Sequence, residues 1–375
     1  MRPPRQGGED VEPSAKSAEL VSGNAPEKRD PQKAQEHSPN QSKAGEAGFL
    51  DARKVALSLT AEEVADFIRR MKSDTSLTSA QRSQLCALAA SSYSRQRPIG
   101  DAVEMVNASF GEGEERHFLL SCVFGSSSDS LSNLWSAASG IQYDQQRESA
   151  FSGISSYIKG LDAARVGDIA SLAKSGKLDG NQAQAIIGGL SLRIQAGADG
   201  SPDDGFQQAL KIVERMKEAG ALDTSDTMRF LSNASVGSPL SAWDALVGIK
   251  GPLDGDVLQE EGGFIVDRMI RSSPQETLDR LVTLSRQDSS LRKFENEWLG
   301  QAAESWLSRD QDEFVAWYSS AGAKLPDGSN DAMVSRVIDV CLRGNDIESA
   351  KSWAKSFRSD EFRKQADARI AESAP

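Results

Sequence analysis

The chain has 375 residues, 38% of them hydrophobic and 6% aromatic, with a mean hydropathy of −0.46. This length with so little apolar content favours two compact domains or one long array over a single deep core. The 43 basic and 55 acidic side chains give a net charge of −12, and no local basic stripe offsets it, so phosphate repulsion argues against nucleic-acid binding.

The N-terminal segment, residues 1–48, differs in composition from the rest. It holds six of the 13 prolines, mixed charges and almost no large apolar side chains. Such a segment buries too little surface to offset its chain entropy, so we predict a disordered tail or linker. The remaining residues, 49–375, carry 36 basic and 47 acidic side chains, a net charge of −11.

From Leu50 onward apolar residues recur at helical spacing, and capping residues mark where helices begin. Residues 273–276, Ser-Pro-Gln-Glu, put serine at the N-cap, proline at the first helical position and glutamate at the third. Residues 60–63, Thr-Ala-Glu-Glu, and 310–313, Asp-Gln-Asp-Glu, predict the same capping box. Ser-Pro pairs at 201–202 and 238–239 indicate two further starts.

These starts recur at a nearly constant interval. From Ser201 through Ser238, Ser273 and Asp310 to Asp346 the intervals are 37, 35, 37 and 36 residues. Weaker starts near positions 60, 97, 128 and 162 extend the series upstream, with intervals of 37, 31, 34 and 39 residues to Ser201. A period in this range is typical of stacked helical units.

A second helix is expected between successive starts, separated by clusters such as Gly262-Gly263 and residues 327–330. These helices are predicted at residues 82–91, 182–194, 227–232, 263–271, 296–307 and 332–343. The pattern therefore predicts an all-α solenoid of about nine helix-turn-helix repeats of roughly 36 residues, spanning residues 49–375. Residues 359–374, apolar only along Phe362, Ala366 and Ile370, are predicted as its C-terminal capping helix.

Two C-terminal units share a motif. Trp306-x-x-x-Asp310 followed by Trp317 recurs as Leu342-x-x-x-Asp346 followed by Trp353, with Leu-Pro-Asp-Gly between them at 325–328. The motif resembles uncharacterised bacterial α-helical repeat proteins with W-x-x-x-D-P-x-x-A-x-x-W units, and the match covers residues 302–368. The hairpins are similar more broadly to tetratricopeptide and HEAT arrays, although the tetratricopeptide W-x-x-L-G-x-x-Y consensus is not met. The resemblance implies an α-solenoid and carries over no catalytic residue.

The sequence predicts no catalytic or metal centre. The only two histidines, His37 and His117, are far apart, and a triad or metal site needs more convergence. Ser171 and Lys174 match S-x-x-K by chance, because the K-S-G motif that should lie on a separate element is contiguous with it. No glycine-rich phosphate motif exists. We expect a protein that is not an enzyme and needs no cofactor.

Paired acids at residues 62–63, 203–204 and 260–261 were weighed as hydrolytic carboxylates. The first two pairs fall in the first turn of predicted helices, where negative charge favours the helix dipole. The third precedes the predicted Gly262-Gly263 turn. Solvated charge is the favoured interpretation. The alternative is a cell-envelope-associated repeat protein that acts on, or supports an enzyme of, envelope polymer metabolism.

Tryptophans are the best candidates for contact with a partner. The candidates are Trp298, Trp306, Trp317, Trp353 and Trp243. Because three of them hold equivalent repeat positions, packing between helices is the favoured interpretation, and exposure of one or two on the inner surface is the alternative.

Compartment is the least defined property. No apolar run reaches the length of about 18 residues that spans a bilayer, and the basic start lacks the apolar stretch of a signal peptide. Cys86, Cys122 and Cys341 are scattered and read as buried, reduced thiols. We expect a cytoplasmic protein by default, and a periplasmic or envelope-tethered one if a leader or anchor precedes Met1.

Together these features predict a non-catalytic scaffold or adaptor. Its helical repeats would bind a protein or peptide partner on a concave acidic surface, and the negative charge would favour basic partners.

Overall fold

The computed structural model describes residues 39–198, 200–249, 255–284 and 294–373. In these ranges all regular secondary structure is helical and no strand occurs, which confirms the all-α fold class. Most of the predicted disordered tail, residues 1–38, lies outside the described residues. Helix α1 (Pro39–Ser58) begins before the boundary that was expected at residue 48.

The elements follow one another with short connections. In the first half they are α2 (Ala61–Ser73), α3 (Ser79–Gln96), α4 (Ile99–Ser109), α5 (Glu114–Ser126), α6 (Leu131–Ser139), α7 (Asp144–Lys159), the 3-10 turn η1 (Ala163–Arg165), α8 (Asp168–Ser171), η2 (Leu172–Ser175) and α9 (Gly180–Gln195). In the second half they are α10 (Pro202–Glu218), α11 (Thr224–Ala234), α12 (Pro239–Gly248), α13 (Gly255–Ser272), α14 (Pro274–Leu284), α15 (Glu295–Arg309), α16 (Gln311–Ala321), η4 (Gly322–Lys324), α17 (Asp327–Arg343), α18 (Ile347–Ala354) and α19 (Asp360–Ser373).

The predicted helix starts agree closely with these bounds. Thr60, Ser201, Asp310 and Asp346 are the N-caps of α2, α10, α16 and α18. The capping box predicted at Thr60 is present, because the Thr60 amide donates to Oε2 of Glu63 at 2.9 Å. Upstream the register is looser, since α6 begins after Ser130 and the start near 162 leads into a 3-10 turn. Capping chemistry is local, so sequence locates these starts well.

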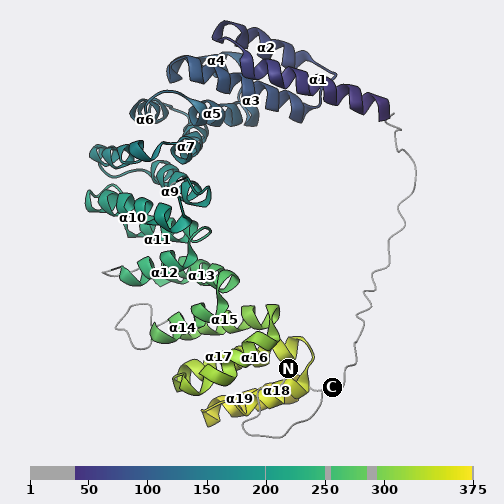
Figure 1. The fold of residues 1–375 in the computed structure, drawn as a ribbon, viewed down its shortest axis with the longest axis vertical. Helices are drawn as coiled ribbons and strands as arrows, with labels where there is room; N and C mark the ends of the chain where they lie inside the picture. Colours follow the sequence, from purple (N-terminus) through teal and green to yellow (C-terminus); the bar gives the residue numbers. More distant parts are fainter. Residues whose placement is uncertain (1–38, 199, 250–254, 285–293, 374–375) are drawn as a thin grey trace.

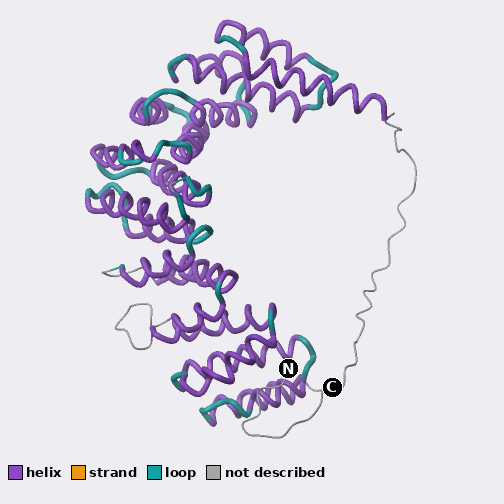
Figure 2. Tube along the Cα trace, viewed as in Figure 1, coloured by secondary structure: helices purple, strands orange, loops and turns teal. Residues whose placement is uncertain are grey.

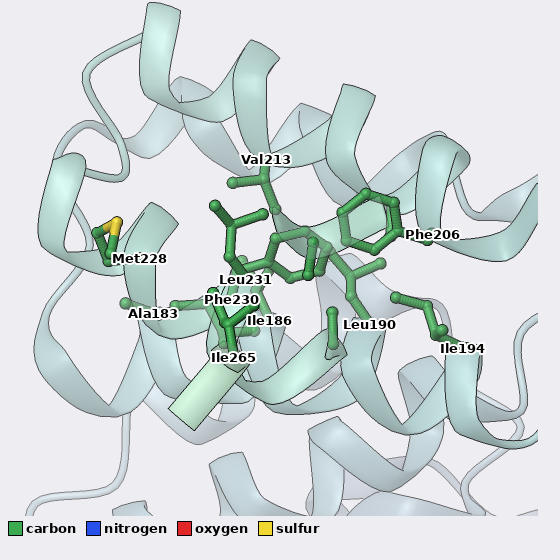
Figure 3. Packing of buried hydrophobic residues seen from close by; sticks show 14 of the residues in the cluster. Ala183, Ile186, Leu190, Ile194, Phe206, Val213, Met228, Phe230, Leu231 and Ile265 are labelled. Carbon is green, nitrogen blue, oxygen red and sulfur yellow. The ribbon is translucent and has the colours of Figure 1, made fainter. Parts of the chain in front are cut away.

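The helices lie in chain order along an arc, with α1 near one end and α19 at the other (Figure 1). All extensive contacts join helices that are adjacent or next but one in the chain. The buried hydrophobic side chains form one continuous cluster that runs from Ala56 to Ile370. Figure 3 shows part of it, where Phe206 of α10 stacks on Phe230 of α11 with ring centroids 5.9 Å apart. The core is therefore a thin line that follows the arc.

The helices form two rows. The odd row consists of α1, α3, α5, α7, α9, α11, α13, α15 and α17, each in extensive contact with the next. The even row consists of α2, α4, α6, α10, α12, α14, α16 and α18, which contact one another far less. A row whose members lie closer together forms the inside of a curve, and in Figure 1 α13 and α15 lie nearer the open side of the arc than α12 and α14 do.

Glycines allow the close contacts of the odd row. A Cβ added at Gly153 of α7 would lie 2.4 Å from the carbonyl oxygen of Ser121 and 2.7 Å from Cβ of Phe124, both in α5. One added at Gly189 of α9 would lie 2.6 Å from Cβ of Ile158 in α7. These separations are shorter than any van der Waals contact, so only glycine fits between these helices.

The Gly262-Gly263 pair was predicted to be a turn between helices, and that prediction is wrong. Helix α13 runs through both residues. A Cβ at Gly262 would lie 2.6 Å from Cζ2 of Trp298 in α15, whereas nothing lies within 4 Å of one at Gly263. Gly262 therefore serves helix packing and not chain reversal. Residues 327–330, also predicted as a separating cluster, form the first turn of α17.

Polar side chains tie several units to the preceding one. Gln96 donates from Nε2 to the carbonyl oxygen of Leu59 at 2.8 Å, and Arg309 donates from Nη1 to that of Arg271 at 2.7 Å. Arg268 donates in the same way to Ser232. These pairs are 37, 38 and 36 residues apart. Each bond satisfies a carbonyl at the C-terminal end of a helix, which has no partner within that helix.

Candidate functional site

The five candidate tryptophans are all buried. The exposed fractions are 0% for Trp298 and Trp353, 1% for Trp306, 2% for Trp243 and 6% for Trp317. Their rings pack against one another, with centroids 5.6 Å apart for Trp243 and Trp298 and 5.8 Å apart for Trp306 and Trp317. The packing interpretation is confirmed. The alternative expected one or two of them to be exposed on the inner surface, and none of the five is exposed.

The other singled-out residues do not converge on a site. His117 is half-buried in α5, and His37 lies outside the described residues. Ser171 ends the four-residue helix α8, and Lys174 lies in the turn η2. In the described ranges no group of three or more His, Cys, Asp or Glu side chains is placed to hold a metal ion.

The cysteines lie in or beside the core. Cys86 and Cys341 are buried, and Cys122 is half-buried. Burial raises the pKa of the Cys86 thiol to about 11, because the thiolate loses hydration there. Such a thiol is a poor nucleophile at neutral pH, and the three cysteines are structural.

The acid pairs lie where the sequence predicts, with one exception. Glu62 and Glu63 are in the first turn of α2, and Asp203 and Asp204 are in the first turn of α10. Glu260 and Glu261, expected before a turn, lie within α13 because the helix continues.

One group of buried polar residues fixes the last helix. Asp331 of α17 accepts hydrogen bonds from the backbone amides of Arg358 and Ser359 at 2.9 and 3.0 Å, just before α19. Its neighbour Asn330 accepts one from the hydroxyl of Tyr318 at 2.8 Å. Because the carboxylate is used for capping a helix, this group serves the end of the array and is not a candidate site.

A pocket of about 490 Å³ lies between two successive units, and one of the five tryptophans, Trp306, lines it. We call it the α14–α16 pocket. Its lining residues are Ser273, Pro274, Gln275, Glu276, Asp279, Trp306, Arg309 and Glu313. They come from the start of α14, the end of α15 and the start of α16. Figure 2 shows the turns before α14 and α16 on the open side of the arc.

Glu313 does not form the capping box that the sequence predicts. Asp310 caps α16 as expected, because its Oδ1 accepts from the amide of Glu313 at 3.0 Å. The Glu313 side chain does not return to the Asp310 amide, which donates instead to the carbonyl oxygen of Trp306 at 2.8 Å. Its Oε2 accepts from Nε1 of Trp306 at 3.2 Å. A buried indole thus holds this carboxylate beside the pocket.

A second indole holds a second carboxylate. Nε1 of Trp317 in α16 donates to Oδ1 of Asp279 in α14 at 3.4 Å, which links the two sides of the pocket. The third acid, Glu276, accepts two bonds from Arg280, at 3.2 Å from Nε and 3.0 Å from Nη2. By contrast, Nε1 of Trp298 and of Trp353 is buried without a hydrogen-bond partner. Only the tryptophans beside the pocket place their polar edges on acids.

The carboxylates that line the pocket outnumber its one lining guanidinium, that of Arg309. Glu276 is paired with Arg280 at 3.0 Å, which leaves the carboxylates of Asp279 and Glu313 facing Arg309. The starts of α14 and α16 each contribute about half a positive charge, which reduces the excess further. None of the eight lining residues is a histidine, cysteine or lysine. The carboxylates of the pocket can attract a cation.

Sequence reasoning missed this pocket although it named two of the tryptophans beside it. Glu276 and Glu313 occupy the same position in successive units, three residues after the N-cap, and both were interpreted as capping residues. The sequence feature that could have indicated the pocket is Trp306, four residues before Asp310, because its indole lies next to Glu313.

Comparisons with known proteins give no further lead. The chain matches no protein-family model, no curated protein and no solved structure. No helix among the described residues is long and apolar enough to cross a membrane.

Proposed function

We propose that the chain is a TPR/HEAT-like α-solenoid that acts as a non-catalytic scaffold, binding a protein or peptide partner. In chain order each even helix is followed by an odd one, from α2–α3 to α18–α19, which gives about nine units with α1 in front. Contacts restricted to neighbouring helices, and polar bonds that each join residues 36 to 38 positions apart, support this interpretation. The resemblance to bacterial helical-repeat proteins remains part of the proposal.

The α14–α16 pocket is the observation that carries the proposed binding role. A hollow with an excess of carboxylates, on a chain whose residues 49–375 have a net charge of −11, suits a basic segment of a partner. An extended arc presents a long surface without a deep enclosed cavity, and this geometry suits an extended peptide or a protein face better than a small metabolite.

Salt dependence tests the proposed function. Peptides of equal length that carry positive, neutral or negative charge are titrated into the full chain by calorimetry, between about 0.05 M and about 0.5 M salt. We expect the basic peptides to bind, and their affinity to fall as ionic strength rises, because carboxylates supply the attraction. Affinity that is indifferent to salt, or a preference for acidic peptides, would contradict the proposal.

The alternative role in envelope polymer metabolism has less support. It needs a carboxyl group with a raised pKa that faces a groove. Backbone hydrogen bonding, and then Arg97, hold the pKa of Glu62 below its usual value, and hydrogen bonds to Thr60 lower that of Glu63. Both groups are fully exposed at the start of α2. These shifts are opposite to those of a general acid, so we favour the scaffold.

A further inference from the structure

The α14–α16 pocket has carboxylates that are positioned but not fully used. An ionised carboxylate offers about four acceptor positions. The Glu313 carboxylate accepts one hydrogen bond from the indole of Trp306, and the Asp279 carboxylate accepts one from the indole of Trp317. The helix caps do not need them, because Asp310 already caps α16. Each therefore retains acceptor positions for a ligand.

The two indoles also limit how these carboxylates move. Trp306 and Trp317 are 1% and 6% exposed, and their rings are fixed by contact with Phe314, at centroid distances of 5.8 and 6.1 Å. A carboxylate bonded to a rigid, buried donor loses less conformational entropy when a ligand binds. The pocket is therefore preorganised for a cation.

We propose that the α14–α16 pocket binds the guanidinium group of an arginine side chain in a partner peptide. This inference rests on the proposed scaffold function and specifies its ligand. A guanidinium presents five donors in a planar fork, so it can bond to Glu313 on one side of the pocket and Asp279 on the other.

Other ligands fit the pocket less well. A lysine ammonium is a compact, strongly hydrated charge that cannot span two carboxylates as a planar fork does. An anion would meet Arg309 and two helix starts favourably, but it would also meet three carboxylates. The volume of about 490 Å³ exceeds one side chain, so residues that flank the arginine are accommodated as well.

The test uses fluorine NMR of the full chain labelled with 5-fluorotryptophan. Capped five-residue peptides with a central arginine, lysine or citrulline are titrated, and the resonance of Trp306 is assigned with Trp306→Phe. We expect a saturable shift of this resonance with the arginine peptide, binding about tenfold weaker with lysine, and no shift with the uncharged citrulline. Equal binding of lysine and arginine would overturn the assignment to arginine.

Two variants provide the matched comparison. Glu313→Gln removes a pocket carboxylate but keeps an acceptor for Trp306, and we expect arginine binding to weaken about tenfold. Asp312→Asn removes the same charge from the same helix turn outside the pocket lining, and we expect less than about a twofold change. Thermal unfolding confirms that both fold.

The possible failures are distinguishable. If the chain binds basic peptides but Glu313→Gln and Asp312→Asn weaken them equally, the pocket assignment fails and the scaffold function stands. If no peptide of any charge binds in the calorimetric series, the proposed function fails as well.

Discussion

The odd and even rows are built from the same helical units but differ in how closely their helices pack. In the odd row glycine lets helices touch, as at Gly153, where no side chain separates α7 from α5. In the even row polar side chains cross the gap, such as Ser241 of α12, whose hydroxyl donates to Oδ1 of Asp203 in α10 at 2.7 Å. The odd row is tightly packed and the even row is not, and the α14–α16 pocket is lined by two helices of the even row and one of the odd row.

Because the two rows pack differently, contacts within them should contribute unequally to the free energy of unfolding. A gap bridged by exposed polar groups contributes little to stability, because water competes for every donor and acceptor. A close contact between buried helices contributes far more and tolerates no extra volume. Substitutions along the two rows should therefore differ in size.

The largest effect is expected at Gly153. Gly153→Ala places a methyl group 2.4 Å from the carbonyl oxygen of Ser121. The backbone of α5 cannot move aside as the end of a flexible side chain could. We expect the free energy of unfolding to fall by about 2–3 kcal/mol, measured by urea denaturation. A loss below about 0.5 kcal/mol would show that α5 and α7 are not in close contact.

Adjacent glycines in α13 provide the next test. Gly262→Ala must displace the buried indole of Trp298 and should cost about 1–2 kcal/mol. Gly263→Ala meets no atom within 4 Å and should stabilise by about 0.5–1 kcal/mol, because alanine favours the helix. Thermal and urea unfolding of the pair give the comparison. Effects of the same sign would contradict the odd-row packing of α13 on α15.

A smaller effect is expected where the even row is bridged. Arg280 of α14 pairs with Asp244 of α12 and, at 3.0 Å, with Glu276. Arg280→Gln should lower the free energy of unfolding by less than about 1 kcal/mol, and the loss should shrink further at high salt. Urea unfolding at two ionic strengths checks this. A loss as large as that of Gly153→Ala would mean that the two rows contribute equally to stability.

The last effect is absent at neutral pH and appears only in alkaline solution, in the buried core beneath the odd row. Burial raises the pKa of Cys86 in α3 from 9.0 to about 11, so the folded state holds this proton more tightly than the unfolded chain does. Its contribution to stability is complete below pH 9 and is lost as pH rises towards 11. We expect Cys86→Ala to make the alkaline fall in stability shallower, by at most about 1.4 kcal/mol per pH unit. An unchanged slope would place the thiol in contact with water.

Sequence predicted the features that depend on local chemistry. Ser201 and Asp310 identify helix starts because a cap needs only its own first turn. The meaning of Gly262 was missed because it depends on Trp298, which lies in the next unit. Periodicity identified the tryptophans as equivalent and favoured packing, which burial confirms.

The pocket escaped prediction for a related reason. Glu313 has the spacing of a capping residue, and only the position of the Trp306 indole shows that it has a different partner. A contact seven residues away on another helix is not encoded in helical periodicity. Arg309 and Asp279 reach the same pocket from helices that the sequence does not show to be adjacent.

Small-angle scattering of the chain lacking residues 1–38 tests serial stacking most directly. A compact protein of this size has a radius of gyration near about 20 Å. Nine stacked pairs spaced about 9–10 Å apart reach on the order of 80 Å, so the radius of gyration should be clearly larger and the distance distribution should have a long tail. A value near 20 Å with a symmetric distribution would contradict the arc and, with it, the open surface on which binding is proposed.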